Sequence, residues 1–182
     1  MEYETIRIAN VTGKCPACED YAEKNSTTPA KIAVMACEGA CSRGEVARRA
    51  ANMVAHRLAR DETVRICLGG AFTKDTGQRN LVRRAKKVIA IEGCFIHCAA
   101  RMMEGVLPDF APVVVQADTL YDSSTIPFGI DEVPDEMFTV FAYKVAEQVV
   151  RDNVKDGGCC NKETTGCPAG NCSPKHSGGC GE

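Results

Sequence analysis

The chain has 182 residues, of which 45% are hydrophobic and 25% are charged, and its formal net charge is −2 at pH 7. This length fits one domain of ordinary size with extensions, and it is sufficient to bury a core. The chain has no Trp and no apolar run of about 18 residues, so we expect neither a nucleic-acid partner read by stacked aromatics nor a membrane-spanning segment.

Charge is unevenly distributed along the chain. Residues 31–105 carry 14 Lys and Arg against 7 Asp and Glu, whereas the rest of the chain carries 8 against 17. A basic part of this kind attracts an anionic small molecule or an acidic redox partner, although solvated helix faces explain the same charges.

Twelve cysteines stand in a chain whose N-terminus is acidic and is followed by no long apolar segment. We therefore expect a cytoplasmic location rather than secretion. In a reducing cytosol, grouped cysteines serve as metal ligands or redox groups rather than as a disulfide framework.

The first 29 residues are expected to form an N-terminal arm, with a short strand at residues 5–11 and a polar helix that ends before Pro29. Cys15 and Cys18 open this helix as a Cys-x2-Cys motif. Half of a metal site is our interpretation of the pair; a redox pair and an exposed pair without a role are the alternatives.

Apolar runs and helical patterns alternate through the middle of the chain. The apolar runs predict buried strands at residues 31–36, 63–68, 88–91 and 112–118. Periodic apolar positions and basic stretches predict helices at residues 42–60, 79–87, 95–104 and 135–155. This alternation predicts an α/β fold, a three-layer open parallel sheet of the Rossmann or flavodoxin type with about four or five strands and flanking helices.

The same pattern divides the chain into three parts. After the arm at residues 1–29, an α/β domain occupies residues 30–156, and a Gly- and Cys-rich tail follows at residues 157–182. The tail has almost no apolar residues to bury, so it cannot build a core of its own. Its cysteines suggest capture of a soft metal ion; they are Cys159, Cys160, Cys167, Cys172 and Cys180.

Five cysteines follow the predicted strands. Cys37, Cys67 and Cys94 each end one of three consecutive strands, and the carboxyl ends of parallel strands meet at one edge of a sheet. Cys41 and Cys98 follow four residues after Cys37 and Cys94, which is about one helical turn. Four thiolates from this set suit a tetrahedral zinc ion, and an iron–sulfur cluster is the alternative cofactor.

Other side chains near these cysteines have weaker assignments. Glu38 and Glu92 each precede a glycine at the two predicted sites, where they would act as an acid or base beside the metal or would be exposed loop residues. His97 separates Cys94 from Cys98 and is expected to point away from both. The sequence therefore assigns no catalytic residue.

Several motifs in order resemble the DGC family, which is named for a central Asp-Gly-Cys. The counterpart here is Glu92-Gly93-Cys94, with Glu in place of Asp, and the segments at residues 35–47 and 67–70 also look like that family. The resemblance covers roughly residues 30–120. It implies a zinc-binding role for the cysteines and supplies no reaction.

We therefore predict a cytoplasmic zinc-binding protein with a metal site at the carboxyl edge of the sheet. The candidate ligands are Cys37, Cys41, Cys67, Cys94 and Cys98. A redox or electron-transfer protein and a soft-metal handling protein that uses the tail are the alternatives. The signatures of acyl or nucleotide chemistry, Gly-x-Ser-x-Gly and Gly-x4-Gly-Lys-Ser/Thr, do not occur.

Overall fold

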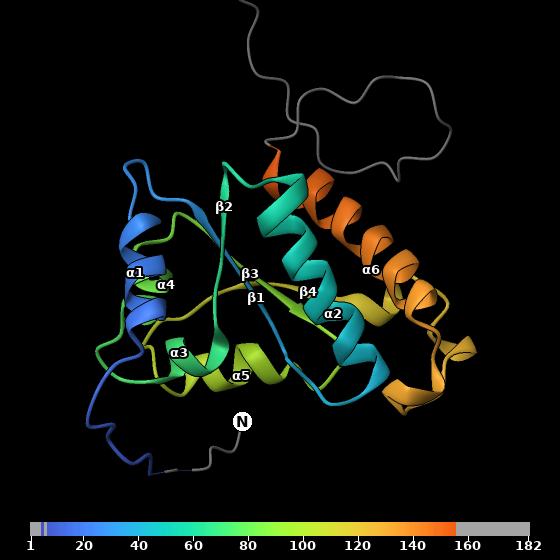
Figure 1. The fold of residues 1–182 in the computed structure, drawn as a ribbon, viewed down its shortest axis with the longest axis horizontal. Coiled ribbons are helices and arrows are strands. Elements are labelled where there is room, and N and C mark those ends of the chain that lie inside the picture. Colours follow the sequence, from blue (N-terminus) through green and yellow to red (C-terminus); the bar gives the residue numbers. More distant parts are fainter. Residues whose placement is uncertain (1–4, 6, 156–182) are drawn as a thin grey trace, which may run out of the picture.

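The structure is a computed structural model that describes residue 5 and residues 7–155. Within these residues the chain alternates between strands and helices (Figure 1). The strands are β1 (Ile32–Ala36), β2 (Thr63–Arg65), β3 (Val88–Glu92) and β4 (Val113–Gln116). The α-helices are α1 (Pro16–Lys24), α2 (Ser42–Met53), α3 (Leu68–Phe72), α4 (Gly77–Arg84), α5 (Cys98–Glu104) and α6 (Asp135–Val149).

The four strands form one parallel sheet in the order β2-β1-β3-β4. Successive side chains of a strand point to opposite faces, and β1 feeds two cores in this way. Ile32 and Val34 belong to a core with residues of α2 and α6, whereas Ala33 and Met35 belong to a core with residues of α1, α3, α4 and α5. Figure 1 shows these two groups of helices on opposite sides of the sheet. The predicted parallel α/β sheet with flanking helices is confirmed.

The strand order creates a switch point between β1 and β3. From β1 the chain crosses to β2 through α2 on one face, and from β3 it crosses to β4 through α5 on the other. Because the two connections leave the sheet on opposite faces, the carboxyl ends of β1 and β3 form the topological switch point of the fold. Ligands of open α/β sheets bind at such a point.

Several local predictions need correction. Residues 5 and 7–11 form no strand. The strand expected over residues 63–68 stops at Arg65, because Cys67 caps a short helix, α3. The helix expected over residues 95–104 begins only at Cys98, because His97 adopts a left-handed backbone conformation with φ 53°.

Two long helices end differently from the prediction. α2 and α6 each continue into one π-helical turn, at Val54–Leu58 and Val150–Val154. Short 3₁₀ turns follow β4 at Ala117–Thr119, Ser123–Thr125 and Ile130–Glu132. No helix within residue 5 and residues 7–155 has both the length and the apolar character of a membrane span. The predicted tail at residues 157–182 lies outside the described residues.

Candidate functional site

The loop between β1 and α2 carries the first cysteine pair. Cys37 follows the last residue of β1, and Cys41 is the N-cap of α2, where its Sγ accepts a hydrogen bond from the Gly44 N–H at 3.4 Å. Between them, a Cβ placed on Gly39 would lie 3.8 Å from both sulfur atoms. The two thiols therefore face a common space that a side chain at position 39 would fill.

This proximity has a different origin from the one that the spacing suggested. Residues 37–41 are not helical, and Glu38 has a positive φ of 51°. A loop, rather than one turn of a helix, brings Cys37 and Cys41 together. The helix begins only at Ser42, whose hydroxyl donates to the Pro127 carbonyl at 2.6 Å and ties the loop to the segment after β4.

The loop between β3 and α5 carries the second pair. Cys94 lies two residues after the end of β3, and Cys98 is the first residue of α5. Both are partly buried. Glu92, at the end of β3, is fully buried, and its carboxylate accepts hydrogen bonds from the backbone N–H groups of Ala99 and Ala100 at 3.3 and 2.8 Å.

These contacts define the role of Glu92 in the fold. The first N–H groups of a helix lack partners within the helix, and a carboxylate beside them also interacts favourably with the helix dipole. Glu92 thus caps α5 and orients Cys98. It is not the exposed loop residue that one interpretation of the sequence suggested.

The two loops touch at the switch point. The Gly93 N–H donates to Sγ of Cys37 at 3.3 Å. A Cβ on Gly93 would lie 2.8 Å from the carbonyl carbon and oxygen of Arg43 and from the Gly44 nitrogen, so only glycine permits this approach. The structure therefore brings the loops that carry both cysteine pairs together at the carboxyl ends of β1 and β3.

The environment sets the protonation of the thiols. The pKa of Cys37 is raised, mainly by burial. The backbone N–H groups of Gly39 and Gly93 oppose this shift, whereas the charges of Glu92 and Cys98 add to it. Burial also raises the pKa of Cys98, with additional contributions from Glu92 and Cys94. These two thiols favour the protonated form in the metal-free protein.

A tyrosine beside these thiols has an unusual environment. Tyr121 is 6% exposed, its ring stacks on Phe141 with centroids 4.7 Å apart, and its hydroxyl has no hydrogen-bond partner among the described residues. Burial raises its pKa, and the nearby charges of Asp118, Cys41 and Cys37 act in the same direction. Sequence reasoning did not single out Tyr121.

A charged pair accompanies Tyr121. Arg43, in the first turn of α2, lies 3.4 Å from the carboxylate of Asp118, which follows β4. Arg43 lowers the pKa of Tyr121 and so partly opposes the effect of burial. Sequence reasoning missed this pair, because its members are separated by 75 positions and only the sheet brings them together.

Two further side chains near the cysteines are Glu38, the other acid–base candidate, and His97, which was expected to point away from the thiols. Glu38 forms an ion pair with Arg65. His97 is partly buried as the N-cap of α5, and its Nε2 atom has no partner among the described residues. Among the described residues, the side chains of Glu38 and His97 form no hydrogen bond with a cysteine sulfur.

The fifth predicted site residue, Cys67, lies in a different environment. It is exposed at the N-cap of α3, and its Sγ accepts from the Gly70 N–H at 3.4 Å. A pocket of about 540 Å³ is lined by Cys67 together with Cys18 of α1 and Glu38, but not by the other four candidate cysteines. Cys67 is therefore associated with the N-terminal Cys-x2-Cys motif.

The thiols of Cys37, Cys41, Cys94 and Cys98 do not surround a common point in this structure. Within residue 5 and residues 7–155, no three His, Cys, Asp or Glu side chains are arranged to hold a metal ion. The donor chemistry nevertheless suits zinc, because four thiols come from two adjoining loops.

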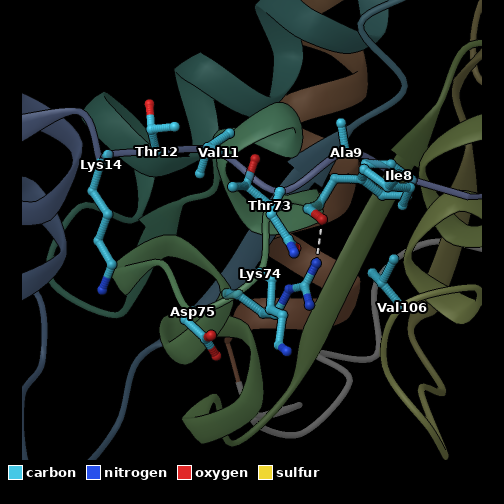
Figure 2. A pocket seen from close by; sticks show the side chains of 13 residues that line it. Ile8, Ala9, Val11, Thr12, Lys14, Thr73, Lys74, Asp75 and Val106 are labelled. Atoms are coloured by element: carbon cyan, nitrogen blue, oxygen red, sulfur yellow. Dashed lines mark hydrogen bonds between the residues drawn. The ribbon is translucent and has the colours of Figure 1, made fainter.

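A further pocket, of about 620 Å³, lies away from the cysteines (Figure 2). The extended segment at residues 8–14 and the loop from Phe72 to Asp75 line it. Arg79 reaches this pocket, but its guanidinium already donates to the carbonyls of Ala71 and Phe72. No cysteine lines it, so this pocket is separate from the candidate site.

Comparison with known proteins identifies a family over the part of the chain that contains the cysteine motifs. The family model described as DGC domain matches residues 33–124, a range that begins in β1 and ends after β4. It includes Cys37, Cys41, Cys67, Cys94 and Cys98. Neither a curated protein nor a solved structure matches the chain significantly. This chain therefore belongs to the DGC domain family.

Proposed function

We propose that this protein binds zinc through the thiolates of Cys37, Cys41, Cys94 and Cys98. The observation that carries the proposal is the contact between the two loops at the switch point, where the Gly93 N–H meets Sγ of Cys37 at 3.3 Å. One pair of thiols stands on each side of this contact, and four thiolates are a common ligand set of zinc in proteins.

The chain's own groups favour binding of a cation by these thiols. Backbone N–H groups donate to the sulfurs of Cys37 and Cys41 and hold these side chains in place. Cys41 and Cys98 lie at the starts of α2 and α5, where helix dipoles also favour negative charge. Binding requires rotation of the thiol side chains toward a common centre and release of their protons.

Zinc held by four thiolates would be structural, whereas zinc held by three would polarise a bound ligand. The unpartnered hydroxyl of Tyr121 and the pair formed by Arg43 and Asp118 are the polar groups beside Cys37 and Cys41. They would orient such a ligand at the switch point between β1 and β3. We assign no reaction to this site.

The proposal extends to location and partners. The seven cysteines within the described residues form no disulfide, which suits a reducing compartment, so we propose a cytoplasmic location. The basic balance of residues 31–105 supports an anionic small molecule or an acidic redox protein as a partner. The metal ion itself is the primary ligand.

Elemental analysis of the full-length protein, purified under reducing and zinc-replete conditions, tests the proposal. We expect Cys37→Ser and Cys94→Ser each to lower the zinc content by one ion per chain. Cys172→Ser is the matched control and should leave it unchanged. Absence of zinc from the unmodified protein would contradict the proposal.

The absorption spectrum separates zinc from the alternative cofactor. Zinc has a filled d shell, so a zinc protein is colourless in the visible range. Anaerobic purification that yields a brown protein with iron and sulfide in place of zinc would favour an iron–sulfur cluster bound by the same cysteines.

A further inference from the structure

Three cysteines gather beside β2, the edge strand of the sheet, where residues of α1, α2 and α3 line one pocket. Cys15 is the N-cap of α1, Pro16 opens the helix, and Cys18 lies in its first turn. Cys67 caps α3, which belongs to the same group of helices. Cys18 and Cys67 line the same pocket, although 49 positions separate them in the sequence.

Specific contacts hold α1 in this position. The carboxylate oxygens of Glu19 accept hydrogen bonds from the Gly77 N–H, the first residue of α4, at 2.9 and 3.1 Å. The Tyr21 hydroxyl accepts from the backbone N–H of Arg65, at the end of β2, at 3.2 Å. The Cys-x2-Cys motif is therefore fixed against the β2–α3–α4 region rather than free in solution.

Cys67 is positioned by the same region. Its backbone N–H donates to Oε1 of Gln78 at 3.0 Å, and Gln78 belongs to α4 and is buried. Because α4 contacts both α1, through Glu19, and Cys67, through Gln78, it keeps the two parts of the thiol group together.

The two thiols of the motif differ in exposure. Cys15 is exposed, whereas Cys18 is partly buried beside the pocket. The backbone N–H of Cys18 is the main cause that lowers the pKa of Cys15, and the Cys18 thiol lowers it further. The interaction with Cys15 is the main cause that raises the pKa of Cys18, followed by burial and by the charges of Cys15 and Cys67.

Metal binding fits this group less well than redox chemistry. Glu38, the carboxylate that lines the pocket, is paired with Arg65 and is not free to act as a fourth ligand. The group therefore offers three thiols, one fewer than the two loops at the switch point offer together. An exposed nucleophilic thiol with a less accessible second thiol one helical turn away is the arrangement of a dithiol–disulfide pair.

We propose that Cys15 and Cys18 form a dithiol–disulfide pair that reduces low-molecular-weight disulfides. Cys67 is a third thiol, in the pocket that Cys18 lines. The Cys15 thiolate attacks one sulfur of the disulfide RSSR, whose S–S bond breaks as RS⁻ leaves. Cys18, after losing its proton, attacks the Cys15 sulfur of the mixed disulfide and releases the second RS⁻.

The electrons and protons of this step balance. The protein pair loses two electrons as it becomes the disulfide between Cys15 and Cys18, and RSSR gains them as it becomes two thiols. The two protons of the cysteine thiols pass through solvent to the two released thiolates. This pair includes none of the four proposed zinc ligands. The outcome of a redox test is therefore independent of whether the protein binds zinc.

The test uses the full-length reduced protein, freed of reductant and loaded with zinc, mixed with glutathione disulfide at pH 7. We expect a fast phase that releases two equivalents of glutathione per chain. Peptide mapping of the quenched product should then show a disulfide between Cys15 and Cys18.

Three variants separate the steps. Cys15→Ser should slow the fast phase at least tenfold. Cys18→Ser should release one equivalent and retain glutathione on Cys15 as a mixed disulfide, because the thiol that resolves it one helical turn away is absent. Cys172→Ser serves as the control and should retain a two-equivalent fast phase.

Two outcomes would overturn the proposal. One is a first disulfide that joins other cysteines, such as Cys18 with Cys67, while Cys15 stays reduced. The other is a loss of one zinc ion per chain in both Cys15→Ser and Cys18→Ser, which would identify these thiols as metal ligands. A far-UV circular dichroism spectrum unchanged from that of the unmodified protein checks that each variant is folded.

Discussion

The buried carboxylate of Glu92 accepts a hydrogen bond of 2.8 Å from the backbone N–H of Ala100. The same carboxylate also accepts from the Ala99 N–H. β3 and α5, which flank the loop that carries Cys94, are joined by these bonds. Glu92 replaces the Asp of the family motif, and its position explains why an acidic residue is useful there: it caps the helix that begins with Cys98.

Removal of this cap should destabilise the protein. Glu92→Ala leaves two buried N–H groups without a partner, and we expect the free energy of unfolding to fall by about 1–3 kcal/mol per unsatisfied group. Glu92→Asp keeps the charge and should cost less. Urea denaturation measures both changes. Glu104→Ala, at an exposed position of the same helix, is the control and should change stability by less than about 0.5 kcal/mol. Equal effects of Glu92→Ala and Glu104→Ala would contradict the capping role.

Gly93 should tolerate no side chain, because its neighbours are backbone atoms of Arg43 and Gly44 at 2.8 Å. We expect Gly93→Ala to lower the free energy of unfolding by at least about 1–3 kcal/mol, the usual cost of overpacking. Gly69→Ala is a matched control within α3, since a Cβ there meets nothing within 4 Å. It should be neutral or stabilising by up to about 1 kcal/mol. Thermal denaturation of the two variants distinguishes these outcomes, and equal melting temperatures would refute the close approach of the loops.

The Tyr121 hydroxyl should contribute no stability to the metal-free protein. It is buried without a partner among the described residues, and an unsatisfied group of this kind costs about 1–3 kcal/mol. We therefore expect Tyr121→Phe to be neutral or stabilising in urea denaturation. Tyr121→Ala should cost about 3–5 kcal/mol, because it also removes the ring that stacks on Phe141. A clear loss of stability in Tyr121→Phe would reveal a partner for the hydroxyl.

Alkaline pH should destabilise the metal-free protein through Cys37. Burial raises its pKa above the ordinary value of 9.0, so the folded protein holds the thiol proton more tightly than the unfolded chain does. The resulting stability is complete below the unfolded pKa and is lost as the pH rises through the folded pKa. We expect the free energy of unfolding to fall less steeply above about pH 8.5 in Cys37→Ala. Cys15→Ala, which removes a thiol of lowered pKa, should not make the fall less steep. Urea denaturation across this pH range compares the slopes, and identical slopes for the unmodified protein and Cys37→Ala would exclude the effect.

The buried strands, their parallel direction and the start of α1 could be predicted, because these features depend on residues close in sequence. The apolar run at residues 88–91 has to be buried on both faces, and a helix after each such run places the strands parallel. The strand ends therefore locate Cys37 and Cys94 at one edge of the sheet. The start of α1 directly after Cys15 also follows from the Pro at its first position.

Helical spacing was a poorer guide to the loops. Cys37 and Cys41 are close because Glu38 takes a positive φ and Gly39 leaves space, not because a helix turns once between them. The periodicity of cysteines alone does not distinguish a helical turn from a loop that folds back over the same number of residues.

The sequence by itself determined the alternating α/β architecture and the edge at which the cysteines collect, because burial and strand direction are encoded in local patterns. Tertiary structure alone decided which thiols are neighbours. Cys67 lies with Cys18 because α4 holds both α1 and α3. Cys37 meets Gly93 because β1 and β3 are neighbours in the sheet, with Ala36 opposite Ile91. These relationships depend on contacts between distant segments, which no local pattern records.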